Sequence, residues 1–194
     1  MFDRVAEQIA GRIFAGNDFD DEKKEVVIYG LSQLLTGIFN LITILVIGIA
    51  YGMPIQAVIF TITYILLRIY AGGYHADTPV RCYVFSVVMI MLVLSGIKWL
   101  KLSKQLYLMS SVVCGLFVFF LSPVDNVNKR LDDKEYMIYG RMARVIVTLE
   151  LILILVFYQL NARDICIAIE YAIITMCMML VLGKVKNREE HEKV

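Results

Sequence analysis

"LSQLLTGIFNLITILVIGIA", residues 31–50, is a run of residues without a single charged side chain. A helix of about 20 predominantly apolar residues spans the hydrocarbon core of a bilayer. Five further apolar stretches follow this one, at 55–67, 83–100, 105–121, 143–160 and 165–182. The stretch 55–67 is short for a complete span, which is compatible with a tilted or re-entrant helix. The sequence therefore predicts an all-α integral membrane protein with about six transmembrane or partly re-entrant helices.

The composition agrees with this prediction. Hydrophobic residues make up 59% of the 194 residues and charged residues 19%, whereas soluble domains are about half apolar and about a quarter charged. The net charge of +1 gives no reason to expect nucleic acid as a partner. Because no repeat or long linker interrupts the pattern, we expect a single membrane domain, 1–194. It divides into an interfacial N-terminal segment (1–28), a helical core (29–183) with a loop at 68–83, and a charged tail (184–194).

The N-terminal segment carries charges throughout and lacks the continuous apolar run of a signal peptide. Phe2, Val5, Ile9 and Ile13 fall on one stripe of a helix, which predicts an amphipathic N-terminal helix. Two interpretations remain open. The helix lies on the membrane surface, or it packs on the protein as a soluble helix does.

Lysine and arginine indicate which loops face the cytoplasm, where these residues gather. With six spans, one side of the membrane receives all of them except Lys98, Lys101, Lys104 and Arg163. We therefore expect a multi-pass protein of the cell membrane, with both termini and the loop 68–83 on the cytoplasmic side. Cytoplasmic thiols are kept reduced, so Cys82 is predicted to be a free thiol.

The remaining cysteines, Cys114, Cys166 and Cys177, fall in apolar stretches, where cysteine usually behaves as a small hydrophobe. The sequence has no CxxC pair, no Cys/His cluster with zinc spacing and no HExxH motif. We expect neither a metal site nor a cofactor.

The loop with the sequence "RIYAGGYHADTPVRCY", residues 68–83, contains the two candidate catalytic residues, His75 and Cys82. His75 precedes Cys82 by seven residues. A cysteine attacks carbonyls as the thiolate, and a neighbouring imidazole takes its proton and later protonates a departing amine. If the segment after Pro79 is helical, Cys82 lies in its first turn, where the helix dipole stabilises a thiolate. The alternative is an ordinary interfacial loop, and the spacing by itself does not decide between the two.

Four neighbouring residues are candidates for supporting the His75–Cys82 pair. Gly72 and Gly73 allow a sharp turn, and their amides are candidate donors to an oxyanion. Arg68 either holds a substrate carboxylate or caps the end of its own helix. Asp77 either orients His75 or N-caps the following helix, and we favour the cap.

The loop resembles the accessory gene regulator B (AgrB) family of membrane cysteine endopeptidases. Arg68, Gly73, His75 and Cys82 match the family pattern in order and spacing. Weaker likeness extends along the chain, to Tyr29–Gly30, Ser122–Pro123 and Lys129–Arg130. The basic stretch departs from the pattern, because Asp125, Asp132 and Asp133 dilute it.

The resemblance implies a function in quorum sensing, with Cys82 as nucleophile and His75 as base and then acid. The substrate would be a small AgrD-like peptide precursor in the lipid bilayer, with an amphipathic leader and an acidic C-terminal tail. Cleavage of the tail would leave the core on Cys82 as a thioester, which a thiol or hydroxyl of the core converts into a cyclic thiolactone or lactone. Lys129 and Arg130 would contact the substrate. The small size of the enzyme is compatible with a homodimer.

Two other functions compete with the peptidase. A small membrane transporter or exporter would suit Glu150 and Glu170, which fall within apolar stretches and would form a substrate or proton site. We favour the alternative, that these acids form a helix–helix hydrogen bond or are protonated near the interface. A non-catalytic sensor partner with the same fold would have an unreactive Cys82.

Overall fold

The computed structural model describes the chain except residues 1, 15–20, 75–77, 101, 126–130 and 192–194. In the described part the chain forms α1 (Asp3–Ile13), α2 (Asp21–Tyr51), α3 (Pro54–Ala71), α4 (Pro79–Trp99), α5 (Lys104–Leu121), α6 (Asp133–Gln159) and α7 (Arg163–His191). The one strand-like feature among these residues is an isolated parallel bridge between Gly72 and Val124. The prediction of an all-α protein is confirmed.

Six of these helices, α2 to α7, are long and apolar enough to cross a membrane. The helix α3 has 18 residues, a length of about 27 Å at 1.5 Å per residue, close to the thickness of about 30 Å of a hydrocarbon core. The apolar stretch 55–67 underestimated this helix because Arg68 and Tyr70 belong to its last turn. The protein is an all-α integral membrane protein with six candidate spans.

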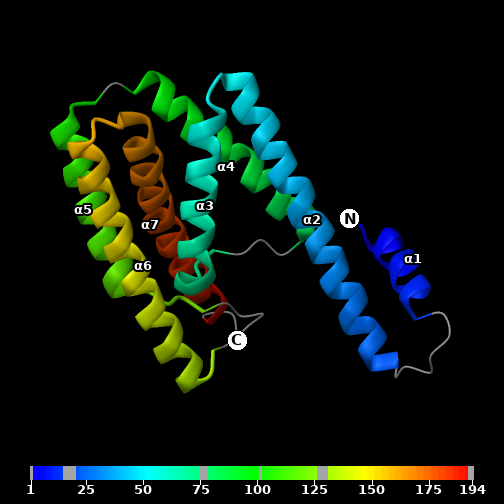
Figure 1. The fold of residues 1–194 in the computed structure, drawn as a ribbon. Helices are drawn as coiled ribbons and strands as arrows, with labels where there is room; N and C mark the ends of the chain where they lie inside the picture. The colour runs from blue at the N-terminus through cyan, green and yellow to red at the C-terminus, as the bar shows by residue number, and fades with distance from the viewer. Residues whose placement is uncertain (1, 15–20, 75–77, 101, 126–130, 192–194) are drawn as a thin grey trace.

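The core lies among α3, α5, α6 and α7, which stand side by side in Figure 1. The helix α7 is the most buried of the candidate spans and packs against α3, α5 and α6. Large side chains fill the interior, among them Phe60 and Leu67 of α3, Ile154 of α6 and Met176 of α7. The helix α4 packs chiefly on α2, has fewer contacts with α3 and α7, and adds the buried Ile90 and Leu94 to the core. The molecule is therefore a four-helix core with an α2–α4 pair beside it.

The helix α1 packs on α2, outside the core, as Figure 1 shows. Ala6 and Ala10 are buried in this contact. The larger apolar side chains Val5, Ile9 and Ile13 remain exposed. The predicted helix is thus present. Ala6, Ala10 and Phe2, whose ring centroid lies 5.6 Å from that of Phe39, hold it to α2. The other members of the predicted stripe, Val5, Ile9 and Ile13, are left available for a lipid surface.

The helices alternate in direction, so the α3–α4 and α5–α6 connections lie at the same end of the molecule as the start of α2 and the C-terminus (Figure 1). Among the residues that the structure describes, this end carries the lysines and arginines except those at the α4–α5 and α6–α7 ends. The alternation supports the charge argument, and the cytoplasmic position of this end stays a prediction.

Candidate active site

Arg68 lies in the last turn of α3 and organises the start of the loop 68–83. Its Nη1 donates a hydrogen bond to the carbonyl oxygen of Gly72, and its Nη2 donates one to the carbonyl oxygen of Tyr74. The guanidinium therefore caps the end of its own helix and holds the carbonyls of the turn that follows it. Of the two roles open from the sequence, the structure supports the cap.

The two glycines adopt backbone conformations that other residues rarely reach, with φ of +71° at Gly72 and +108° at Gly73. A Cβ atom on Gly72 would lie 2.0 Å from the carbonyl oxygen of Val124. A Cβ atom on Gly73 would lie 2.6 Å from Nη1 of Arg68 and 2.9 Å from the carbonyl oxygen of Met179. Both positions thus require glycine for close approach as well as for the turn.

The amides of these glycines are already bonded within the protein. Gly72 donates to the carbonyl of Arg68 at 3.1 Å and Gly73 to the carbonyl of Val124 at 3.1 Å. The expectation that they serve as oxyanion donors is wrong for this conformation, because the helix end and the bridge to Val124 take both N–H groups.

The same turn ties together three parts of the chain. Val124 donates to the carbonyl of Ala71 at 2.9 Å, and Tyr74 donates to the carbonyl of Met179 on α7 at 2.9 Å. A Cβ atom on Gly183 would lie 2.7 Å from the carbonyl carbon of Gly73, so α7 approaches the turn through another glycine. The start of the loop is therefore fixed to α3, α7 and the segment after α5.

Cys82 lies in the first turn of α4, as the sequence predicted. Pro79 opens the helix, and the Thr78 side chain caps it by accepting from the amide of Arg81 at 3.3 Å. The amide of Cys82 donates to the carbonyl of Thr78 at 3.0 Å. The N-cap predicted at Asp77 is wrong, because the chain enters the helix one residue later and the threonine hydroxyl takes that place.

The Cys82 thiol is free, exposed and on the wall of a cavity of about 180 Å³. The cavity is lined by Tyr64, Arg68, Tyr74, Cys82, Phe85, Ser86, Met89 and Met179. The rings of Tyr74 and Phe85 contact each other, with 5.5 Å between centroids. Arg68 and Cys82, the two ends of the motif, are thus brought to one largely apolar cavity between α3, α4 and α7.

A second cavity, of about 430 Å³, also has Arg68 in its lining. It is bounded by Ile65, Arg68, Ile69, Tyr70, Gly72, Pro123, Val124, Asp125, Leu131 and Tyr139. Arg68 is the residue common to the linings of the two cavities.

Four of the predicted site residues, His75, Asp77, Lys129 and Arg130, lie outside the described residues. Tyr64 and Met179, which line the Cys82 cavity, were missed by the sequence reasoning. They reach it through the packing of α3 and α7, for which the local sequence carries no signal. Tyr74 was also missed, although it stands next to the glycines in the motif.

The two intramembrane acids lie elsewhere, and neither lines the Cys82 cavity. Glu170 is buried and accepts a hydrogen bond from the hydroxyl of Tyr158 at 3.0 Å, which links α7 to α6. This confirms the helix–helix hydrogen bond for Glu170. Glu150 is also buried, and neither of its carboxylate oxygens has a hydrogen-bond partner in the described part of the chain.

Known proteins match this chain over most of its length. The family model of accessory gene regulator B matches residues 6–182, which include the glycine turn, Cys82 and most of α7. The chain belongs to the AgrB family. This confirms the resemblance carried by the loop motif.

Curated AgrB-family relatives are distant in sequence. "Putative AgrB-like protein 2" of Clostridium perfringens (strain 13 / Type A) is 24% identical over 195 residues, covering 93% of this chain and 91% of the relative. "Protein FsrB" of Enterococcus faecalis (strain ATCC 47077 / OG1RF) is 29% identical over 107 residues, covering 53% of this chain and 44% of the relative. No solved structure matches the chain.

Proposed function

We propose that this protein is a membrane-embedded cysteine endopeptidase that removes the C-terminal tail of a small quorum-sensing peptide precursor. Membership of the AgrB family supports the role in quorum-sensing peptide processing. The observation that carries the mechanism is the Cys82 thiol in the first turn of α4, on a cavity that Arg68 and Tyr74 of the glycine turn also line.

In the proposed reaction the Cys82 sulfur attacks the carbonyl carbon at the junction between core and tail. His75 takes the thiol proton and passes it to the amine of the tail as the peptide bond breaks. The core remains bound to Cys82 as a thioester. A thiol of the core then attacks the thioester carbonyl, Cys82 recovers its proton through His75, and a cyclic thiolactone leaves.

The surroundings of Cys82 suit these steps. A helix N-terminus stabilises negative charge, which favours the thiolate as attacking group and as leaving group. Tyr64, Phe85 and Met89 give the cavity an apolar lining, which keeps water from the thioester. One thioester replaces another in the ring closure, so that step needs no ATP. Arg68 is a positioning residue here, since it holds the carbonyls of the turn that leads to His75.

The remaining assignments concern substrate placement. The proposed active site faces the cytoplasm, because the loops at its end of the molecule carry most of the basic residues. Lys129 and Arg130 would receive the acidic tail of an AgrD-like precursor, and the exposed stripe Val5, Ile9 and Ile13 of α1 would share the membrane surface with its leader. A homodimer is compatible with this arrangement.

The proposal is tested without the precursor by alkylating the purified protein across a pH series and following each cysteine by peptide mass spectrometry. We expect Cys82 to react readily below pH 7 and His75→Ala to move its reactivity to higher pH. Cys166, which is fully buried, serves as the internal control and should stay unreactive in both proteins. If Cys82 behaves as an ordinary thiol with and without His75, the activated pair is absent from the free enzyme. That result would favour the alternative that the protein is a non-catalytic sensor partner.

A further inference from the structure

A third cavity, of about 350 Å³, lies outside the candidate active site, where α5 ends and α6 begins. It is lined by Pro123, Tyr136, Met137, Gly140, Arg141, Arg144 and Val145. Two of these residues are arginines and none is acidic, so the cavity is positively charged. The proposed peptidase mechanism does not use it.

One of the two guanidinium groups is held in place by α5. Arg144 donates from Nε to the carbonyl oxygen of Phe119 at 3.3 Å, and its Cζ lies 5.7 Å from the centroid of the Phe119 ring. The Nη2 atom of Arg144 lies near Gly140, 3.9 Å from the position that a Cβ atom on this glycine would take. The same position is 3.1 Å from Cδ of Pro123. A fixed, planar donor group beside a residue without a side chain is suited to an anion with several oxygens.

The depth of this cavity in the membrane follows from α5. The helix has 18 residues, about 27 Å, so its ends lie near the two boundaries of a hydrocarbon core of about 30 Å. Phe119 stands two residues before its end. Arg144 therefore lies near the boundary where hydrocarbon meets headgroups, and Arg141 lies nearly one turn closer to water along α6.

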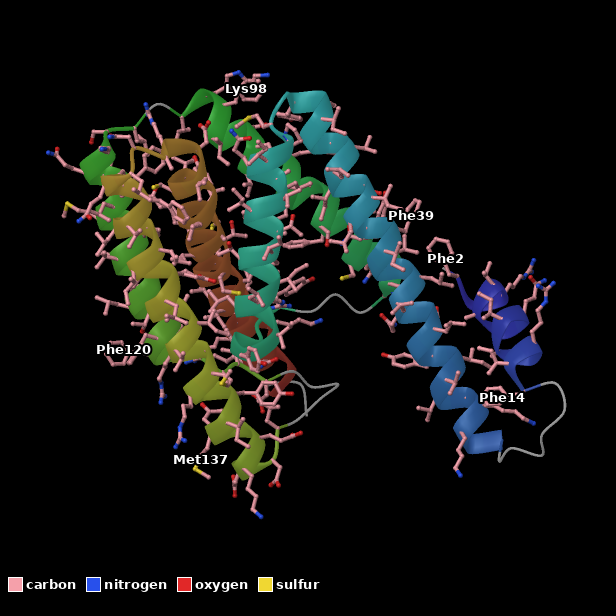
Figure 2. The ribbon with its side chains drawn as sticks, in the orientation of Figure 1. Phe2, Phe14, Phe39, Lys98, Phe120 and Met137 are labelled. Atoms are coloured by element: carbon pink, nitrogen blue, oxygen red, sulfur yellow. The ribbon has the colours of Figure 1, made fainter. Side chains whose placement is uncertain are left out.

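The cavity also has an apolar, outward-facing border. Met137 and Val145, which line the cavity, are 65% and 48% exposed. Phe120, the residue after Phe119 in α5, is 74% exposed. Figure 2 shows Met137 and Phe120 at the same end of the bundle, on its outer side. Arginines at headgroup depth with exposed apolar side chains beside them match the two parts of a phospholipid, an anionic phosphate and acyl chains.

We propose that this cavity binds the headgroup phosphate of an anionic phospholipid, with Arg141 and Arg144 as the phosphate ligands. A lipid fits better than an acidic peptide, because the border of the cavity is apolar and lies on the outer side of the α5–α6 pair. Basic cavities between membrane helices on the cytoplasmic side are typical sites for such headgroups. The site is independent of the peptidase mechanism, so either proposal stands without the other.

The test is native mass spectrometry of the full chain in detergent micelles doped with phosphatidylglycerol or phosphatidylcholine. We expect the protein to retain phosphatidylglycerol preferentially. Arg141→Gln should weaken that binding about fivefold, the factor for one basic residue near an anionic surface, and Arg141→Lys should retain most of it. Arg141 is the better target because Arg144 also bonds to Phe119.

Lys134→Gln is the matched control, since Lys134 is an exposed basic residue of the same helix that does not line the cavity. Equal retention of the two lipids, or equal losses in the Arg141→Gln and Lys134→Gln proteins, would overturn the proposal. Inorganic phosphate and hexaglutamate are added as competitors. If either displaces phosphatidylglycerol at concentrations comparable with the lipid, the occupant is a free anion or an acidic peptide, and the lipid assignment is wrong.

Discussion

Replacing Gly72 by alanine should unfold the start of the active-site loop. A residue with a side chain at φ +71° and ψ −139° has a conformational cost of about 1–3 kcal/mol. The new Cβ would also lie 2.0 Å from the carbonyl oxygen of Val124, and relieving such an overlap costs about 1–3 kcal/mol more. We therefore expect Gly72→Ala to lower the free energy of unfolding by about 2–6 kcal/mol.

The assay is thermal unfolding in mild detergent, with alkylation of the buried Cys166 as the readout of opening. A chain of this size loses about 2–4 °C in Tm for each kcal/mol, so Tm should fall by about 4–24 °C. Gly37→Ala is the control, because nothing lies within 4 Å of a Cβ atom there and alanine favours a helix by up to about 1 kcal/mol. If the two variants melt within about 1 °C of each other, the close approach of Gly72 to Val124 does not exist in the protein.

Three further predictions concern the nucleophile, the buried acid and the helix cap. Cys82→Ala should abolish cleavage of a coexpressed precursor, whereas the control Cys114→Ala should preserve it. Mass spectrometry of the peptide products measures both. Cleavage by the Cys82→Ala protein would show that Cys82 is not the nucleophile. Glu150→Gln removes a carboxylate that has no hydrogen-bond partner among the described residues, so cleavage should persist and Tm should be no lower. Loss of cleavage would argue for a role of Glu150 in the reaction. Thr78→Ala removes the cap of α4 and should cost about 0.5–2 kcal/mol, measured as a lower Tm, with Thr78→Ser restoring it.

The sequence predicted the membrane fold because apolar length and charge act locally along the chain. Residues 31–50 are long and apolar enough for a span, and a helix opened by Pro79 would hold Cys82 in its first turn, as the structure has it. The sequence also offered the helix end as one of two roles for Arg68, and this role is local, since the carbonyls that Arg68 bonds are only four and six residues away.

What the sequence did not predict depends on contacts between distant segments. The hydrogen bond from the amide of Gly73 to the carbonyl of Val124 occupies a donor that the sequence suggested was free. The close approach of Gly183 to Gly73 brings α7 against the turn. The partner of Glu170 is Tyr158 on another helix. None of these pairs has a spacing that a helix or a turn would reveal, so they become visible only once α3, α5, α6 and α7 pack together.

The two ends of the loop 68–83 are held by different parts of the molecule. The glycine turn is fixed to α3, α7 and Val124, whereas Cys82 belongs to α4, which packs chiefly on α2. Thr43 of α2 lies 3.1 Å from the hydroxyl of Tyr83, the residue after Cys82, and Tyr51 lies 3.1 Å from Ser95 by their hydroxyl oxygens. The position of the thiol relative to the turn is therefore set by how the α2–α4 pair sits on the four-helix core. Substitutions in that contact should alter the reactivity of Cys82 from a distance, because they move the nucleophile without touching the turn that leads to His75.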